Sequence, residues 1–202
     1  MNDHRIVRRS ILAASLGLGG GLAMPPLRHA LAAYPDRPIK WIVPYAAGGG
    51  SDVIARLVSV GLSQRLGQSF VIDNRPGGAT NIGAEAAAKA APDGYTVLTA
   101  DNGTLVFNPA LFRKLPYDVD RDFRPVGLLA RFHMVLAVTK EAPVRNARDF
   151  VERARAAPRG INYGSAGIGS PHHLTMARLA RETGIELTHV PYRGVAPCLL
   201  YT

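Results

Sequence analysis

Apolar positions between residues 34 and 100 follow two spacings, one typical of strands and the other typical of helices. Ile39–Val43 is a short run of β-forming residues, whereas the apolar residues from Val53 to Leu66 recur every three or four positions. The same alternation then predicts a strand, a helix and a strand over Ser69–Asp73, Ile82–Ala90 and Tyr95–Thr99. Turns rich in glycine, proline and asparagine separate these elements, so the pattern predicts parallel β-α-β units.

The second half of the chain repeats this alternation after a less regular connection, Asn102–Asp122, in which we expect one short helix. The expected strands are Val126–Ala130, Met134–Thr139, Ile161–Tyr163 and Leu187–Val190, and the expected helices are Ala147–Ala156 and Pro171–Thr183. Right-handed crossovers place every strand-to-helix turn of a parallel sheet at its carboxyl edge, where ligands bind. We therefore predict an α/β chain whose turns form the functional site.

Helix ends are predicted from capping residues. Ser51 or Asp52 should cap the first helix and Asn81 the second, because their side chains can accept hydrogen bonds from free backbone N–H groups. Gly67 should end the first helix, since glycine readily takes the left-handed conformation.

The first 33 residues are typical of an export signal and are set apart from the fold. Arginines precede an apolar, glycine-containing run, Ile11–Met24, and small residues follow it, which predicts cleavage after Ala32 or Ala33. A membrane anchor would need about 20 uninterrupted apolar residues, and this run is shorter. Arg8 and Arg9 resemble a twin-arginine signal but also suit an ordinary charged region, so the Tat and Sec routes both stay open.

Charge indicates the class of ligand or partner, and the cysteine content bears on disulfides and the cellular compartment. The chain carries 24 basic and 15 acidic side chains, a net charge of +9, which favours an anionic ligand. Its basic residues are scattered singly with few aromatic neighbours, so nucleic acid is not expected as a partner. Cys198 is the one cysteine, which excludes an internal disulfide but is compatible with an oxidising compartment.

Two glycine-rich turns, Ala46–Asp52 and Gly164–Ser170, each follow a predicted strand and open a predicted helix. At such a turn, unpaired backbone N–H groups and the positive end of the helix dipole attract carboxylate or phosphate. Either turn alone is equally explained as a tight connection without a ligand. Two of them suggest a cleft that grips an anion from both sides, and Asp52 could also accept a hydrogen bond from a ligand ammonium or hydroxyl.

Motifs for nucleotide binding and hydrolysis are not met in these turns. A P-loop needs a lysine where Asp52 stands, and a dinucleotide fingerprint needs a glycine where Val53 stands. No G-x-S-x-G motif surrounds Ser51 or Ser165, so no catalytic serine is predicted.

The remaining polar candidates lie in the second half. His172 and His173 are adjacent, so their side chains should point to different sides of the helix. That arrangement suits one packed and one solvated histidine better than a metal site. Arg193 follows a strand and either reaches into the cleft or stays on the surface. We expect no metal, cofactor or catalytic residue.

Short motifs follow one another in a fixed order along nearly the whole chain after residue 33. They include Val43–Asp52, Asn74–Gly78, Ala91–Tyr95, Tyr163–Ser165 and Val190–Gly194. In this order they resemble the Bug family, the periplasmic receptors of tripartite tricarboxylate transporters. The resemblance implies an α/β fold of the type II periplasmic-binding-protein kind, with a cleft between a first lobe, 34–130, and an incomplete second lobe, 131–202.

The resemblance also implies how a ligand is held. In the family, backbone amides of the two turns bind the ligand's carboxylate, partly through water, and the lobes close around it. This role carries over to Ala47, Gly49, Asp52, Thr104 and Asn108 in the first lobe and to Ser165, Gly169, Ser170 and His173 in the second. The implied protein is a monomeric periplasmic receptor that delivers a small carboxylate to membrane transporter subunits. A small-molecule enzyme and a ligand sensor for a membrane signalling partner remain alternatives.

The end of the chain departs from the family. Chains of the family continue well past the motif that ends at Gly194, whereas the residues from Cys198 to Thr202 no longer resemble it. We therefore expect a truncated or frameshifted fragment. Missing return strands would leave sheet edges and apolar faces exposed, so weak stability and poor or absent ligand affinity are expected.

Overall fold

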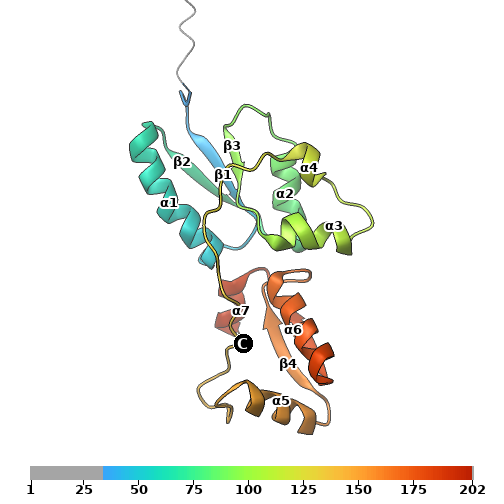
Figure 1. Cartoon of the computed structure of the whole chain (residues 1–202). Coiled ribbons are helices and arrows are strands. Elements are labelled where there is room, and N and C mark those ends of the chain that lie inside the picture. The colour runs from blue at the N-terminus through green and yellow to red at the C-terminus, as the bar shows by residue number, and fades with distance from the viewer. Residues whose placement is uncertain (1–33, 202) are drawn as a thin grey trace, which may run out of the picture. The chain divides into compact units, whose positions relative to one another are not determined.

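Strands and helices alternate along residues 34–201, the part of the chain that the computed structural model describes (Figure 1). The predicted export signal, residues 1–33, lies outside the described residues. Two parallel sheets, one from each half of the described chain, give the α/β architecture that the sequence predicts. We call each sheet with its helices a lobe; the lobe boundary after residue 130 stays a prediction.

The first lobe is built on a three-stranded parallel sheet of order β2-β1-β3. Its strands are β1 (Ile39–Val43), β2 (Phe70–Asn74) and β3 (Thr96–Leu98), and its crossover helices are α1 (Gly50–Leu66) and α2 (Asn81–Ala88). Trp41 and Val43 of the central strand pack with Ala55 of α1 in a buried core. Burial of this apolar surface fixes α1 on the sheet.

Short helical turns complete the first lobe. A 3₁₀ turn, η1 (Gly78–Thr80), precedes α2, and a π turn, η2 (Gly103–Phe107), runs into α3 (Asn108–Leu111). A further short helix, α4 (Val119–Asp122), follows. The connection that the sequence predicted with one short helix therefore contains three helical elements.

The second lobe holds a two-stranded parallel sheet of β4 (Ile161–Ser165) and β5 (Leu187–Pro191). Its helices are α5 (Ala147–Ala156), α6 (Pro171–Thr183) and α7 (Val195–Tyr201). Phe150 and Ala154 of α5 pack with Ile185 to form its core. The bounds of α5 and α6 are those that the sequence predicts.

The two strands expected at Val126–Ala130 and Met134–Thr139 are wrong, because neither segment pairs with another strand of the described chain. Their side chains are largely exposed, with Val126 at 93% and Val135 at 81%. β-forming residues make a strand only where a neighbouring strand takes up their backbone N–H and C=O groups. No described strand does so here, and the segment has no regular structure.

Two of the predicted helix caps are also wrong. The cap of α1 is Gly49, which makes no side-chain hydrogen bond, so neither Ser51 nor Asp52 has this role. Asn81 is the first residue of α2 rather than its cap. Gly67 does end α1, in the left-handed conformation that the sequence predicts.

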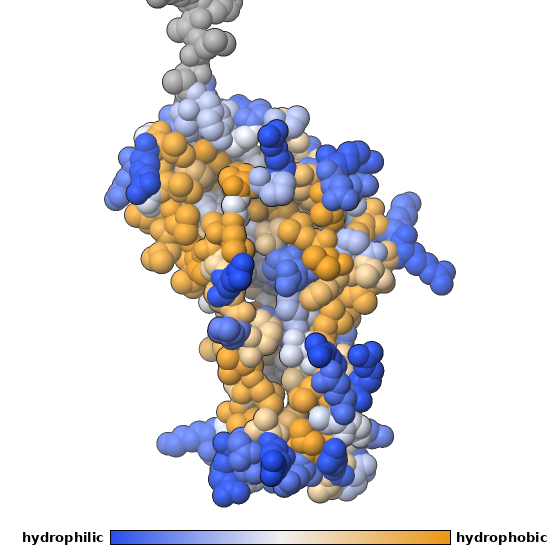
Figure 2. All heavy atoms as spheres, in the orientation of Figure 1, coloured by the Kyte–Doolittle hydropathy of each residue, from blue (hydrophilic) through white to orange (hydrophobic). Residues whose placement is uncertain are grey.

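Apolar side chains gather on the exposed surface over α1 (Figure 2). Val53, Leu57 and Val60 are each more than half exposed, at 53%, 74% and 59%. Only one face of this helix is therefore taken up by the core. Within residues 34–201, no helix combines the length and apolar character that a membrane crossing needs.

Candidate functional site

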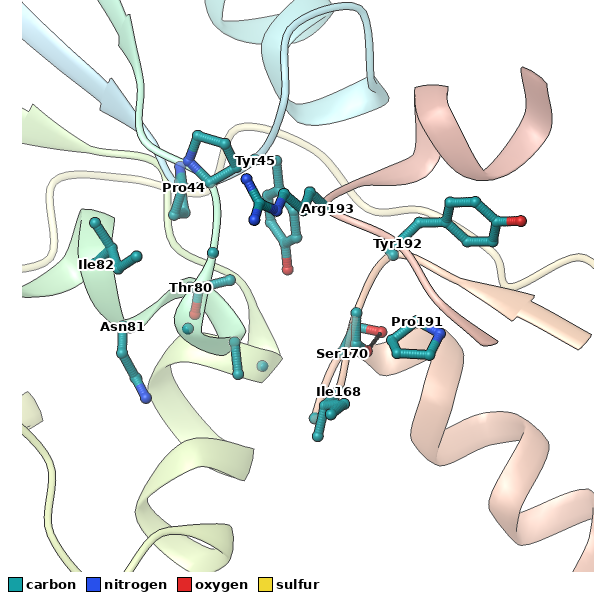
Figure 3. Close-up of a pocket in the computed structure, with 18 of the residues that line it drawn as sticks. Pro44, Tyr45, Thr80, Asn81, Ile82, Ile168, Ser170, Pro191, Tyr192 and Arg193 are labelled. Atoms are coloured by element: carbon teal, nitrogen blue, oxygen red, sulfur yellow. Dashed lines mark hydrogen bonds between the residues drawn. The ribbon is translucent and has the colours of Figure 1, made fainter. Parts of the chain in front are cut away.

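A cleft of about 630 Å³ lies between the two lobes (Figure 3). The first lobe lines it with Pro44, Tyr45, Pro76–Ile82, Gly103 and Phe112. The second lobe lines it with Ala166–Ser170 and Pro191–Arg193. Apart from Phe112, these residues lie at the carboxyl ends of the five strands or follow them, which is where the sequence predicts a ligand site.

Two of the predicted ligand residues, Gly169 and Ser170, line the cleft. Ser170 caps α6, because its hydroxyl accepts a hydrogen bond from the backbone N–H of His173 and donates one to the Gly167 carbonyl. Gly167 and Gly169 have φ angles of 132° and 75°, which glycine adopts without strain. The turn therefore has a defined shape and offers the cleft small side chains and backbone.

The other two second-lobe candidates, Ser165 and His173, are not among the cleft-lining residues and support the turn from behind. Ser165 is 1% exposed, and its hydroxyl accepts a hydrogen bond from the Gly167 N–H at 3.1 Å and lies 2.6 Å from Nε2 of His189. Nδ1 of His173 accepts a hydrogen bond from the Gly169 N–H at 3.1 Å. Both side chains thus shape the turn that faces the cleft.

Three stacked rings lie behind this turn. His189 stacks between Tyr163 and His173, with ring centroids 5.0 Å and 4.1 Å apart. Sequence reasoning missed His189, whose place follows from the register that sets it opposite Tyr163. Burial lowers the pKa of both histidines, and the neighbouring His173 lowers the pKa of His189 further. Both rings are therefore neutral at neutral pH, the state in which Nδ1 of His173 can accept a hydrogen bond.

His172 has surroundings different from those of His173, but both are half-buried, so the predicted solvated histidine is wrong. Nδ1 of His172 is buried without a hydrogen-bond partner within the described part of the chain. Burial lowers the pKa of His172, and Asp101 partly opposes this effect. Asp101 accepts a hydrogen bond from the Tyr45 hydroxyl at 2.6 Å. Residues 34–201 contain no cluster of histidine, cysteine and acidic side chains that could hold a metal ion.

The first glycine turn meets the cleft less directly than expected. None of its predicted residues, Ala47, Gly49 and Asp52, is among the cleft-lining residues. Two of its backbone N–H groups are already bonded within the protein. The N–H of Ala46 donates to the Arg193 carbonyl at 3.3 Å, and the N–H of Gly48 donates to the Asp52 carboxylate at 2.9 Å.

Asp52 joins this turn to two elements of the first lobe. The residue is 3% exposed, and its carboxylate accepts hydrogen bonds from Arg56 Nε and Asn74 Nδ2, each at 3.0 Å, besides that from Gly48. Burial raises the pKa of Asp52, but the hydrogen bonds and the charge of Arg56 outweigh it and hold the pKa below its usual value. The carboxylate therefore stays ionised, and its hydrogen bonds to these donors give it a structural role.

The loop Pro76–Ile82, which sequence analysis did not select, lines the cleft in place of the glycine turn. Ala79 and Thr80 have φ angles of 55° and 72°, a strained conformation for residues with a Cβ atom. Nδ2 of Asn108 donates to the Ala79 carbonyl at 2.7 Å, and the Thr104 hydroxyl donates to the Thr80 hydroxyl at 2.9 Å. Thr104 and Asn108, predicted as ligand residues, are fully buried and hold this loop.

The sequence left open whether Arg193 reaches into the cleft or stays on the surface. Arg193 lines the cleft and is also exposed to solvent. It is the charged residue of the lining, and no acidic side chain accompanies it there. A cleft lined by backbone-rich loops and a guanidinium stabilises negative charge. The Ser165–His189 pair is no exposed nucleophile, since Ser165 is buried behind the turn.

Comparison with known proteins matches residues 54–201 to the tripartite tricarboxylate transporter family receptor. Similar solved structures include Rpa4515 of R. palustris with adipate (42% identity, TM-score 0.80) and the periplasmic binding protein BugD (31%, 0.73). MatC of Rhodopseudomonas palustris with bound malate is also similar (33%, 0.72). Each match covers 83% of this chain. The matched part is 56% of the Rpa4515 chain, 56% of the BugD chain and 57% of the MatC chain. The chain likewise spans 51% to 57% of the curated relatives it matches.

These similarities confirm the α/β fold of a periplasmic binding protein with two lobes and a cleft. The matched residues include every cleft-lining residue except Pro44 and Tyr45. The chain therefore belongs to the family of tripartite tricarboxylate transporter receptors.

Proposed function

We propose that this protein is an exported receptor that binds a small carboxylate between its lobes and delivers it to a tripartite transporter in the membrane. The composition of the cleft carries the proposal: loops from both lobes and one guanidinium line it, without an acidic side chain. Such a lining attracts an anion and offers hydrogen-bond donors to it. The related structures with adipate and malate support a carboxylate as the ligand.

The nine residues expected to bind the ligand divide into three roles in this proposal. Gly169 and Ser170 contact the ligand directly, because they line the cleft. The residues that hold the lining loops and the first turn in shape are Asp52, Thr104, Asn108, Ser165 and His173. Ala47 and Gly49 stay proposed contacts for a ligand that extends beyond Tyr45.

Export to the periplasm is part of the proposal. Signal peptidase would remove residues 1–33, or 1–32, and leave Tyr34 or Ala33 as the first residue. Amino-terminal sequencing of the protein recovered from a periplasmic extract tests this. Recovery only in the cytoplasm, beginning at Met1, would contradict export.

Calorimetric titration of the purified chain tests the proposed ligand class. Adipate, malate and adipamide are titrated separately, because adipamide keeps the length of adipate and removes both charges. The sequence left open that this chain binds poorly or not at all, but loops of both lobes line the cleft. We therefore expect weak but saturable binding of at least one of the two acids and none of adipamide. Equal binding of adipate and adipamide, or no binding of either acid, would contradict the proposal.

A further inference from the structure

We propose that Arg193 is a specificity-determining residue that pairs with one carboxylate of a two-carboxylate ligand. This inference rests on the proposed function, since it assigns a partner to one end of the proposed ligand. Arg193 stands just after β5, and its side chain extends toward the side of the cleft formed by Pro44 and Tyr45 (Figure 3). It therefore lies where the two lobes face the same ligand.

The backbone around Arg193 is held by both lobes. Its carbonyl accepts a hydrogen bond from the Ala46 N–H of the first lobe at 3.3 Å. On one side, the Tyr192 N–H donates to the Ser165 carbonyl at 3.0 Å. On the other side, Gly194 has a φ of 141°, and a Cβ there would lie 3.2 Å from the Ala46 nitrogen. Only glycine fits this approach, so the base of the arginine side chain has a fixed place at the cleft.

The guanidinium of Arg193 has no acidic partner in the cleft. The acidic side chain beside the neighbouring first turn, Asp52, is bonded to Arg56 and Asn74. None of the ion pairs between residues 34 and 201 includes Arg193. A guanidinium presents two parallel N–H donors that match a carboxylate, and this makes an incoming acid its natural counterion.

Two ends of the cleft then have different chemistry. One end is the backbone-rich pair of loops that includes Ala79 and Gly169, which approach so closely that a Cβ added to Gly169 would lie 3.8 Å from the Cβ of Ala79. The other end is Arg193 beside Tyr45. A monocarboxylate can satisfy only one of these ends, whereas a dicarboxylate can satisfy both. The cleft should therefore favour a diacid over a monoacid of equal length.

Comparison of adipate with hexanoate measures this preference, because the two acids differ at one terminal group. Arg193→Gln removes the positive charge, and Arg193→Lys keeps it without the planar pair of donors. Arg181→Gln, which changes an exposed arginine in the last turn of α6, is the matched control. Circular dichroism first establishes that each variant folds like the unchanged chain.

We expect the unchanged chain to bind adipate about tenfold more tightly than hexanoate, as for a charge-assisted pair that is partly open to water. Arg193→Gln should bring this ratio close to one, Arg193→Lys should give an intermediate ratio, and the control should keep the full ratio. A full ratio in Arg193→Gln would overturn the inference while leaving the proposed function standing. Failure of the unchanged chain to bind either acid would instead overturn the proposed function.

Discussion

Replacing Asp52 by alanine removes the carboxylate that joins the first glycine turn to α1 and β2. The buried carboxylate accepts hydrogen bonds from the Gly48 N–H, Asn74 Nδ2 and Arg56 Nε at 2.9 to 3.0 Å. Asn74 keeps a second bond, to the Tyr45 carbonyl, so only part of its hydrogen-bonding capacity is lost. The substitution is therefore expected to loosen the turn without removing apolar surface from the core.

The expected cost follows from these partners. A hydrogen bond contributes about 0.5–1.5 kcal/mol net where water can replace the lost acceptor. The substitution removes one such bond from the exposed Gly48 and one from the half-buried Asn74. The side chain of Arg56 is 53% exposed, so loss of its ion pair adds less than about 1 kcal/mol. The total is about 2 kcal/mol, equivalent to a fall in Tm of about 4–8 °C for a chain of this size.

Urea unfolding followed by circular dichroism measures the free energy of unfolding, and a thermal melt gives the Tm. Asp120→Ala is the control, because Asp120 is exposed and its side chain should contribute less than about 0.5 kcal/mol. A Tm for Asp52→Ala within about 2 °C of the unchanged chain would refute the structural role assigned to this carboxylate.

Two further predictions concern stability. The pKa values of His173 and His189 are lowered in the folded state. As the pH falls through about 6.5, the unfolded state therefore binds more protons than the folded state, and the free energy of unfolding should decrease. A urea midpoint that stays constant between about pH 7.5 and 5.5 would count against this. Gly83→Ala should destabilise by about 1–3 kcal/mol in thermal melts, because its Cβ would lie 2.8 Å from the Cβ of Pro44. Gly61→Ala, with no atom within 4 Å, should stabilise by about 0.5–1 kcal/mol, and the reverse order would contradict the packing.

Local signals were sufficient for α5 and α6 of the second lobe, whereas α7 was not predicted. The Asn146 side chain accepts a hydrogen bond from Asp149 at the start of α5, and Ser170 with Pro171 begins α6, which Gly184 ends in the left-handed conformation. These caps involve residues close in sequence, so a pattern can reveal them. The strands expected within 126–139 failed because strand formation depends on a distant partner that no sequence pattern specifies.

The same distinction explains which part of the cleft was predictable. Gly169 and Ser170 belong to a turn whose bonds are local. The positive φ angles of Ala79 and Thr80, by contrast, accompany hydrogen bonds from Asn108 and Thr104, more than twenty positions away. The family resemblance selected Thr104 and Asn108 as ligand residues, but no local pattern indicates that they also hold this loop.

NMR of the isotope-labelled chain during an adipate titration shows whether a carboxylate binds in the cleft between the lobes. We expect saturable shifts of the backbone amides in Gly77–Thr80 and Ala166–Ser170 and of Nε of Arg193, with only small shifts in α5. Shifts confined to surfaces away from these loops, or no shifts at saturating adipate, would contradict binding in the cleft.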